Sequence, residues 1–245
     1  MKKKISVIIP YYNNIKFIFA SINSVLNQTY KNLEIILIYD DVNKTDLNLI
    51  KKKFKNKIKY IVNDQNLGPA QSRNKGLKAS KGYYIAYLDA DDFWKKNKLK
   101  KQVKFMEKNN LDLSYTSYQI KNDNFKIIHK IKRNYSYNEL LKKCDIGLST
   151  VIMKSNLIKL GTFPNLRTQE DYALWLMYLR KGVKIAGLNQ VLSIWRNTPN
   201  SISKNTFRKV IDAYKVYHRF EKKNLIISIY RVLILSINKM IKLAK

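Results

Sequence analysis

Four short apolar segments, separated by stretches with helical spacing, constrain the fold of this chain more than any other feature. They are rich in Ile, Val and Tyr and cover residues 5–10, 33–39, 58–62 and 83–88. Segments of this length and composition are typical of buried strands. Between them, apolar side chains recur three or four positions apart, as in helices. The alternation predicts an α/β fold whose sheet is mostly parallel, with helices on both faces.

The rest of the chain continues this pattern less regularly. We predict helices at 96–108 and 170–181, two weaker strands within 113–131, strands at 183–187 and 190–195, and helical structure from about 203 to the end. No internal repeat and no flexible linker is evident, and the chain has only seven glycines. We therefore expect one domain over 1–205, with halves 1–92 and 93–205, and a helical C-terminal extension over 206–245.

The composition suits a folded enzyme in a reducing compartment. The chain has 245 residues, 45% of them hydrophobic, which is ample for a core. One cysteine, Cys144, and two distant histidines exclude a disulfide framework and a Cys/His zinc site. The apolar run after the basic N-terminus is too short for a signal peptide, and Pro10 interrupts it, so we interpret it as a strand. These features predict a cytoplasmic protein.

The net charge of +31 has two interpretations. It would attract the protein to an anionic partner, such as a nucleic acid, a lipid surface or a phosphorylated substrate. Alternatively, it reflects a biased genome, because Lys, Asn and Ile are abundant throughout and the lysines are not gathered in one block. The charge alone does not decide between them.

Acidic residues nevertheless collect where the predicted strands end. Asp40 and Asp41 follow the second strand, and Asp89, Asp91 and Asp92 follow the fourth. In open parallel sheets, ligands bind beyond the carboxyl ends of the strands. With a further pair, Glu170 and Asp171, these groups hold seven of the seventeen acidic residues. This edge is therefore the candidate site.

Three carboxylates within four positions repel one another, and a divalent cation would offset their charge. Mg²⁺ or Mn²⁺, bound by carboxylates and substrate phosphates, fits this pattern. The alternative is a solvated turn in which Asp91 or Asp92 caps the next helix. The phosphate-binding patterns GxGxxG and GxxxxGK[ST] are both absent. A nucleotide would thus be held by the metal, by its base and by cations such as Arg73. Taken alone, Arg73 would more simply be an exposed helix arginine.

Five segments together resemble the family 2 glycosyltransferases over residues 4–205. They are SVIIPYYN (6–13), SVLNQTYKNLEIILIYDD (24–41), NLGPAQSRNKGL (66–77), GYYIAYLDADD (82–92) and TQEDYALWLMYLRKG (168–182). The resemblance implies the GT-A fold, which is Rossmann-like. It also implies a nucleotide-sugar-binding half over 1–92 and an acceptor-binding half over 93–205.

The resemblance implies roles for particular residues. Pro10 and Tyr12 would line the base pocket, Asp41 would meet the base or its ribose, and Arg73 would contact the base. Asp89 and Asp91 match the DxD motif, in which Asp91 would be the principal metal ligand and Asp89 would lie near the ribose or the metal. Asp92 would assist this motif.

Asp171 matches the catalytic base of the family, which takes the proton of the acceptor hydroxyl. Glu170, Trp175 and Arg196 would shape the acceptor or donor-sugar site. For the Glu170–Asp171 pair the alternative is helix N-terminal charge, which the macrodipole favours. Two departures from the family pattern concern the loop at Val42 and Asn43, which replace Gly and Ser, and Asn197, where many members have histidine.

The C-terminal segment 222–245 predicts a basic, amphipathic helix. Its polar residues form a narrow stripe on a wide apolar surface, at Ser228, Arg231, Asn238, Lys239, Lys242 and Lys245. Such a helix can lie in an anionic membrane surface. The alternative is packing on the domain or on a second subunit.

The resemblance, together with the acidic strand-end edge, therefore implies an inverting glycosyltransferase that uses Mg²⁺ or Mn²⁺ and a nucleotide diphosphate sugar, most simply a UDP-sugar. The acceptor would be a glycan or a lipid-linked saccharide of surface polysaccharide synthesis, at the inner face of the cell membrane. Two alternatives remain. One is a catalytically silent relative that binds nucleotide or scaffolds a complex. The other is a basic nucleic-acid-binding protein, which the acidic strand-end edge disfavours.

Overall fold

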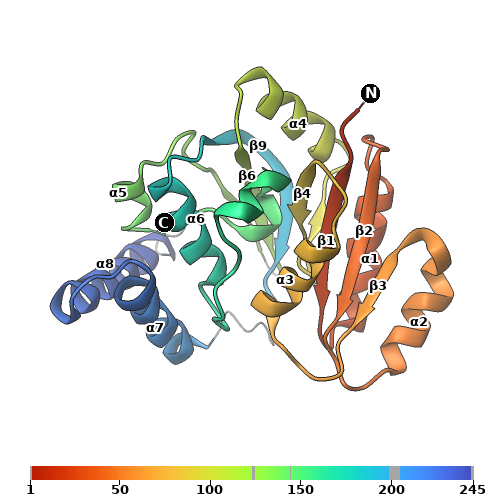
Figure 1. Cartoon of the computed structure of the whole chain (residues 1–245), viewed down its shortest axis with the longest axis horizontal. Helices are drawn as coiled ribbons and strands as arrows, with labels where there is room; N and C mark the ends of the chain where they lie inside the picture. The colour runs from red at the N-terminus through yellow and green to blue at the C-terminus, as the bar shows by residue number, and fades with distance from the viewer. Residues whose placement is uncertain (1, 123–124, 144, 199–204, 244–245) are drawn as a thin grey trace.

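A mixed sheet runs through the domain in the computed structural model, which describes residues 2–122, 125–143, 145–198 and 205–243 (Figure 1). Within these residues the sheet has nine strands in the order β3-β2-β1-β4-β8-β6-β9-β5, and β7 pairs with β6. The strands are β1 (Ile5–Tyr11), β2 (Leu33–Tyr39), β3 (Lys59–Val62), β4 (Tyr84–Tyr87), β5 (Phe93–Trp94), β6 (Leu113–Lys121), β7 (Lys126–His129), β8 (Ile152–Lys154) and β9 (Ile185–Arg196).

The four predicted N-terminal strands are confirmed, and their pairing is parallel as expected. β1 pairs parallel with β2 and β4, and β2 with β3. The second half is less parallel than predicted, because the short strand β8 runs antiparallel between β4 and β6. The two strands predicted at 183–187 and 190–195 form one strand, β9, whose register against β6 shifts near Thr116 and Ser117. A bulge keeps such a strand continuous although its hydrophobic alternation is broken.

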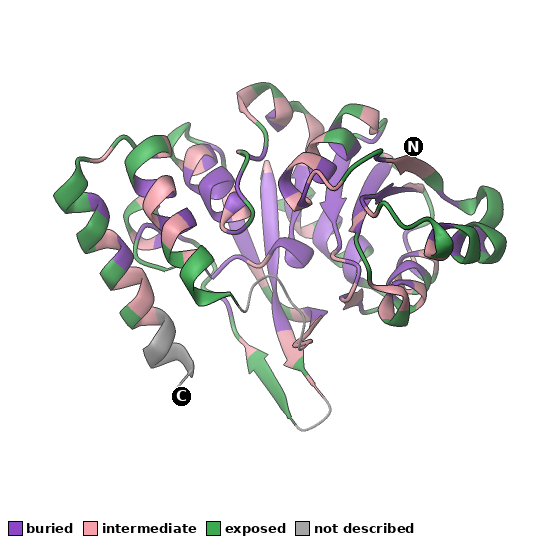
Figure 2. Cartoon of the chain, turned by 90° about the horizontal axis from the view of Figure 1, so that it is seen from below, coloured by how far each residue is buried: buried purple, intermediate pink, exposed green. Residues whose placement is uncertain are grey.

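Helices cover both faces of the sheet, as predicted. α1 (Ile15–Leu26), α2 (Thr45–Phe54) and α4 (Lys98–Lys108) pack in one apolar cluster with Val7 and Ile9 of β1. α3 (Pro69–Ala79) and α6 (Glu170–Arg180) pack in a second cluster with Ile8, which points to the opposite face. Strands β1 and β4 and most of β2 are buried between these layers, whereas β3 and β7 are partly exposed (Figure 2). A Cβ on Gly76 of α3 would lie 2.5 Å from Ile8, so this helix sits very close to the sheet.

The C-terminal segment is helical, as predicted, and packs on the domain at the end remote from β2 and β3 (Figure 1). It consists of α7 (Thr206–Lys215), the π-helical turn η5 (Val216–Phe220) and α8 (Leu225–Leu243). Val216, Tyr217 and Val232 join the same buried cluster as Tyr172 of α6. Cys144 and Lys245 lie outside the described residues, as do the side chains of Lys239 and Lys242. No helix in the described ranges has the length and hydrophobicity to cross a bilayer.

Candidate active site

The strand-end carboxylates lie on one edge of the sheet. β8 is antiparallel to both β4 and β6, and β9 is parallel to β6, so β9 runs in the same direction as β4. The carboxyl ends of β1, β2, β4 and β9 therefore share an edge. The DxD residues Asp89 and Asp91 follow β4 there, and Arg196 ends β9.

Arg73 links the DxD motif to the start of α6. Its Nη2 donates to Asp89 Oδ1 at 2.7 Å, and its Nη1 donates to Glu170 Oε1, 97 residues away in sequence. The arginine is buried, whereas the Asp89 side chain is 35% exposed and can still meet a ligand. Arg73 was predicted to contact a nucleobase. Its two terminal nitrogens instead hold carboxylates, because a buried guanidinium needs paired charges around it.

The Arg73 contact places Glu170 and Asp171 beside the DxD residues. Burial raises the pKa of Glu170 to about 7, although the Arg73 charge opposes this shift. Burial also raises the pKa of Asp171, and here too Arg73 acts in the opposite direction. A carboxylate with a raised pKa is a stronger proton acceptor than an ordinary aspartate. Asp171, half-buried at the start of α6, can therefore act as a general base.

Asp91 is suited to a hard divalent cation. Its Oδ2 accepts a hydrogen bond from Thr198 Oγ1 at 3.3 Å, and burial together with the Asp89 charge raises its pKa to about 6. A cation between the two carboxylates would remove this repulsion. Within the described residues no group of three His, Cys, Asp or Glu side chains could hold a metal. Mg²⁺ is usually bound by one or two carboxylates, with substrate phosphates as further ligands. Asp89 and Asp91 therefore fit a magnesium site.

Asp92 is neither an open ligand nor a helix cap, the two roles left open by the sequence. It is buried, and its Oδ1 accepts a hydrogen bond from the backbone N–H of Arg196 at 3.1 Å. The residue preceding α4 is Asn97. Asp92 therefore fastens the loop after β4 to the end of β9.

Arg196 lies at the same place. Its guanidinium carbon lies over two aromatic rings, 4.8 Å from the ring centroid of Phe17 and 4.7 Å from that of Phe93. Burial lowers its pKa, and the charges of Asp92 and Asp91 oppose this effect. This cation is therefore held beside the DxD carboxylates, where an anionic ligand could meet it.

The two aspartates after β2 have different surroundings. Asp40 is buried and accepts hydrogen bonds from Asn63 and from the backbone N–H groups of Leu67 and Gly68, so it shapes the loop before α3. Asp41 is half-buried and accepts from the backbone N–H of Asn13 at 3.1 Å. Asp41 therefore joins the loops after β1 and β2 while remaining accessible.

The predicted base-pocket residues lie at the end of β1, next to these loops. Pro10 is half-buried within β1 and faces Ile38 of β2 in the strand register. Tyr12 is 52% exposed just beyond the strand. An exposed aromatic ring at this edge is available to stack on a flat ligand.

Sequence reasoning missed two residues that hold the DxD loop. Ser149, in the 3₁₀ helix η2 (Leu148–Thr150), accepts a hydrogen bond from the Asp89 backbone N–H at 3.1 Å. Its carbonyl accepts from Trp94 Nε1 at 2.7 Å. The second is Thr198, the partner of Asp91. A single Ser or Thr in an irregular segment has no periodic signal, so neither could be found without the fold.

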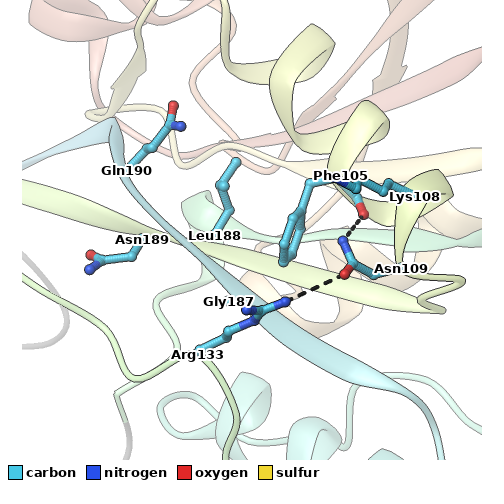
Figure 3. A pocket seen from close by; sticks show the side chains of 8 residues that line it. All are labelled: Phe105, Lys108, Asn109, Arg133, Gly187, Leu188, Asn189 and Gln190. Atoms are coloured by element: carbon cyan, nitrogen blue, oxygen red, sulfur yellow. Dashed lines mark hydrogen bonds between the residues drawn. The ribbon is translucent and has the colours of Figure 1, made fainter.

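A pocket elsewhere on the molecule is lined by none of the candidate site residues (Figure 3). It has a volume of about 430 Å³ and is lined by the end of α4 and the middle of β9, including Phe105, Arg133 and Leu188. None of the described residues that line it has a carboxylate side chain. It is therefore not a continuation of the candidate active site.

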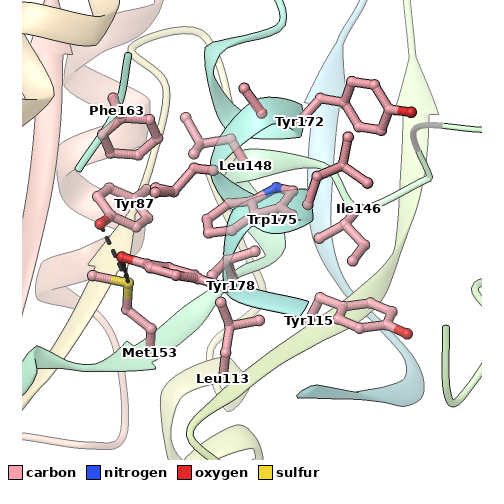
Figure 4. Close-up of a cluster of buried hydrophobic side chains, with 14 of the residues drawn as sticks. Tyr87, Leu113, Tyr115, Ile146, Leu148, Met153, Phe163, Tyr172, Trp175 and Tyr178 are labelled. Carbon is pink, nitrogen blue, oxygen red and sulfur yellow. Dashed lines mark hydrogen bonds between the residues drawn. The ribbon is translucent and has the colours of Figure 1, made fainter. Parts of the chain in front are cut away.

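Trp175 does not shape a sugar site in this structure, contrary to the prediction. It is fully buried and packs near Phe163 and Tyr178, with ring centroids 6.4 and 6.2 Å away (Figure 4). Helix α6 presents its first turn to the site and buries Trp175 one turn later. Its ring is therefore part of the core that holds α6 in place.

A Rossmann-like sheet with a DxD loop and a carboxylate pair at its binding edge defines a protein of the nucleotide-sugar glycosyltransferase class. The sequence model of glycosyl transferase family 2 matches residues 6–159, and the chain belongs to this family. It is 39% identical over 209 residues to the UDP-Glc:alpha-D-GlcNAc-diphosphoundecaprenol beta-1,3-glucosyltransferase WfaP of Escherichia coli. That match covers 84% of this chain and 82% of WfaP.

Solved structures confirm the GT-A fold. The S. aureus TarS 1-349 structure in complex with UDP-GlcNAc superposes with a TM-score of 0.73 at 23% identity, covering 89% of this chain and 65% of that one. The mannosyltransferase PcManGT from Pyrobaculum calidifontis, in complex with GDP-Man and Mn²⁺, gives a TM-score of 0.69 at 15% identity. That match covers 91% of this chain and 66% of the PcManGT chain.

Proposed function

We propose that this glycosyltransferase transfers a sugar, with inversion, from a UDP-sugar to a hydroxyl group of a lipid-linked saccharide. The observation that carries the proposal is the double ion pair of Arg73 with Asp89 and Glu170. The ion pairs bring the DxD residues, which suit a metal-bound nucleotide diphosphate, next to the Glu170–Asp171 pair, which contains the proposed base. We assign the donor to 1–92 and the acceptor to 93–205.

Asp171 would accept the proton of the acceptor hydroxyl while its oxygen attacks the anomeric carbon. The bond between that carbon and the diphosphate breaks on the opposite face, and the electron pair leaves with the diphosphate. A positioned carboxylate typically contributes about 10²- to 10⁴-fold to such a step. Arg196 is a cation near the DxD carboxylates and would attract the diphosphate.

A divalent cation, Mg²⁺ or Mn²⁺, would be held by Asp91 and Asp89 and would offset the charge on the diphosphate. The chemistry of the donor set supports this assignment, since both groups are carboxylates, and burial together with the Asp89 charge raises the pKa of Asp91. The Mn²⁺ in the PcManGT complex gives a precedent for this fold. Asp41, Pro10 and Tyr12 would hold the nucleoside beside the cation.

The donor and acceptor classes come from the relatives. The name of WfaP specifies UDP-Glc as donor and a diphosphoundecaprenol-linked GlcNAc as acceptor, and TarS was solved with UDP-GlcNAc. These names support a UDP-sugar and an undecaprenol-type acceptor for this chain. Because such an acceptor is anchored in lipid, we place the enzyme in the cytoplasm, at the inner face of the cell membrane.

A panel of nucleotide sugars tests the proposal. With Mn²⁺ present, a UDP-sugar at about 100 times its Kd should stabilise the fold by about 2.7 kcal/mol, and GDP-mannose should not. The stabilising donor should then be transferred to a synthetic GlcNAc-diphosphate lipid. NMR of the product should show an anomeric configuration opposite to that of the donor. Retention of configuration, or no response to any UDP-sugar, would contradict the proposal.

The charge of Arg73 should set the pH dependence of transfer. Asp171 must be ionised to act as a base, so activity is lost as the pH falls through its pKa. Arg73 holds this pKa down, so Arg73→Gln should move the acidic limb of the kcat/KM profile to higher pH. Arg73→Lys retains the charge and should keep the limb near its original position. If the acidic limb does not move in Arg73→Gln, the Arg73 charge does not control the pKa of the catalytic base.

A further inference from the structure

Helix α8 packs on the domain through Val232 and part of its polar stripe, and leaves most of its apolar side chains facing outward. Ser228 is fully buried, and Asn238 donates to the backbone carbonyl of Lys142 at 2.8 Å. Seven apolar side chains of α8 are between 40% and 78% exposed: Leu225, Ile226, Ile227, Ile229, Tyr230, Leu233 and Ile237. Much of this helix, which ends at the C-terminus, is coloured as exposed or intermediate in Figure 2. A helix on the surface of a soluble protein normally buries its apolar side and exposes its polar side to solvent. The exposed face of α8 therefore requires another apolar environment.

The neighbouring helix α7, which packs against α8, extends the exposed apolar surface. Phe207 is 78% exposed, and Val210 is 41% exposed. Isolated exposed apolar side chains are common on proteins, but a run of them along one helix is not. We name the exposed side chains of α8 together with these two the apolar C-terminal face.

The exposed charges of the described part of segment 206–245, which carries the apolar C-terminal face, are all positive. Segment 206–245 has two acidic residues, Asp212 and Glu221, and both are buried. Asp212 pairs with Lys215 at 3.3 Å, and Glu221 pairs with Arg180 at 3.1 Å. The exposed charged side chains of the described part of this segment are those of Arg208, Arg219 and Lys222. An occupant of this face must therefore be both apolar and anionic.

We propose that α8 lies in the surface of an anionic lipid bilayer, with the apolar C-terminal face at the boundary between headgroups and acyl chains. Burial of apolar side chains and attraction of cations to anionic lipid both favour this placement. A second copy of the chain is a poorer occupant, since each copy has a formal charge of +31 and the same exposed cations in this segment. The proposal concerns the location of the protein and does not depend on the transfer reaction.

Vesicle co-sedimentation of the full chain tests this proposal. The unaltered protein should bind vesicles that contain phosphatidylglycerol, and should bind pure phosphatidylcholine vesicles at least tenfold more weakly. The triple variant Ile226→Gln, Ile229→Gln and Leu233→Gln should lose at least tenfold in affinity for the anionic vesicles. Its fold should remain intact, because the three side chains are exposed.

A matched control substitutes apolar residues that are similarly exposed elsewhere: Leu49→Gln, Ile127→Gln and Ile128→Gln. This variant should bind the anionic vesicles as the unaltered protein does. Reversing charge with Arg208→Glu, Arg219→Glu and Lys222→Glu should weaken binding at low salt. Equal binding by the first triple variant and the unaltered protein would overturn the proposal. So would a homodimer, seen by light scattering, that dissociates in that variant.

Discussion

Asp171→Asn should lower kcat for sugar transfer by about 10²- to 10⁴-fold and leave donor affinity nearly unchanged. Asparagine has the same shape but cannot take the proton of the acceptor hydroxyl. The proposed donor contacts, through Asp89 and Asp91, involve other side chains and should survive. Single-turnover transfer at saturating donor measures the loss, and calorimetric titration with UDP and Mn²⁺ measures binding.

Asp64→Asn serves as the control for this experiment. Asp64 is exposed and also follows a strand of the sheet, so it tests the effect of removing one negative charge near the same edge. Its kcat should stay within about twofold of the original, in line with the small effects usual at exposed sites. If Asp171→Asn transferred sugar as fast as this control, the base would have to be another group.

Asp91→Ala should abolish the Mn²⁺ dependence of UDP binding, with a loss of affinity of about 100-fold or more. Substitutions of residues that only support a metal ligand typically cost about 10- to 100-fold, so loss of a direct ligand should cost at least as much. Calorimetry of UDP binding with Mn²⁺ and with EDTA measures this effect. In the variant the two titrations should coincide.

Asp92→Asn separates metal binding from loop structure. Asp92 is buried and accepts a hydrogen bond from the backbone of Arg196, which an asparagine Oδ1 can also accept, so this variant should keep the loop and a Mn²⁺-dependent affinity for UDP. A Mn²⁺ response in Asp91→Ala as large as in the unaltered protein would remove Asp91 from the metal site. The two neighbouring aspartates thus give opposite expected results.

Local patterns in the sequence were sufficient for the parallel half of the fold. Strand and helix periodicities depend on neighbouring residues, and the predicted strands at β1 to β4 lie within a few residues of those observed. Short strands such as β8, with three residues, have too few positions to show a period. Pairing with β4 and β6, distant in sequence, stabilises it instead.

The sequence by itself determined that carboxylates follow the strands, because strand ends and acidic residues are both local features. Only the tertiary structure decided how these groups are used. Arg73 became a link between two motifs because folding placed two carboxylates around a guanidinium that could not be buried alone. Trp175 lies in the core because only the first turn of α6 reaches the binding edge of the sheet, and the later turns pack against the domain.

The orientation of α8 on the domain likewise could not be predicted from the sequence. Its amphipathic pattern predicted a polar stripe and a wide apolar surface, and either side could have faced the domain. Asn238 donates a hydrogen bond to the backbone carbonyl of Lys142, and Val232 belongs to the same buried cluster as Tyr217. Contacts between segments far apart in the chain therefore selected which side of the helix is left outside, and no local pattern encodes such contacts.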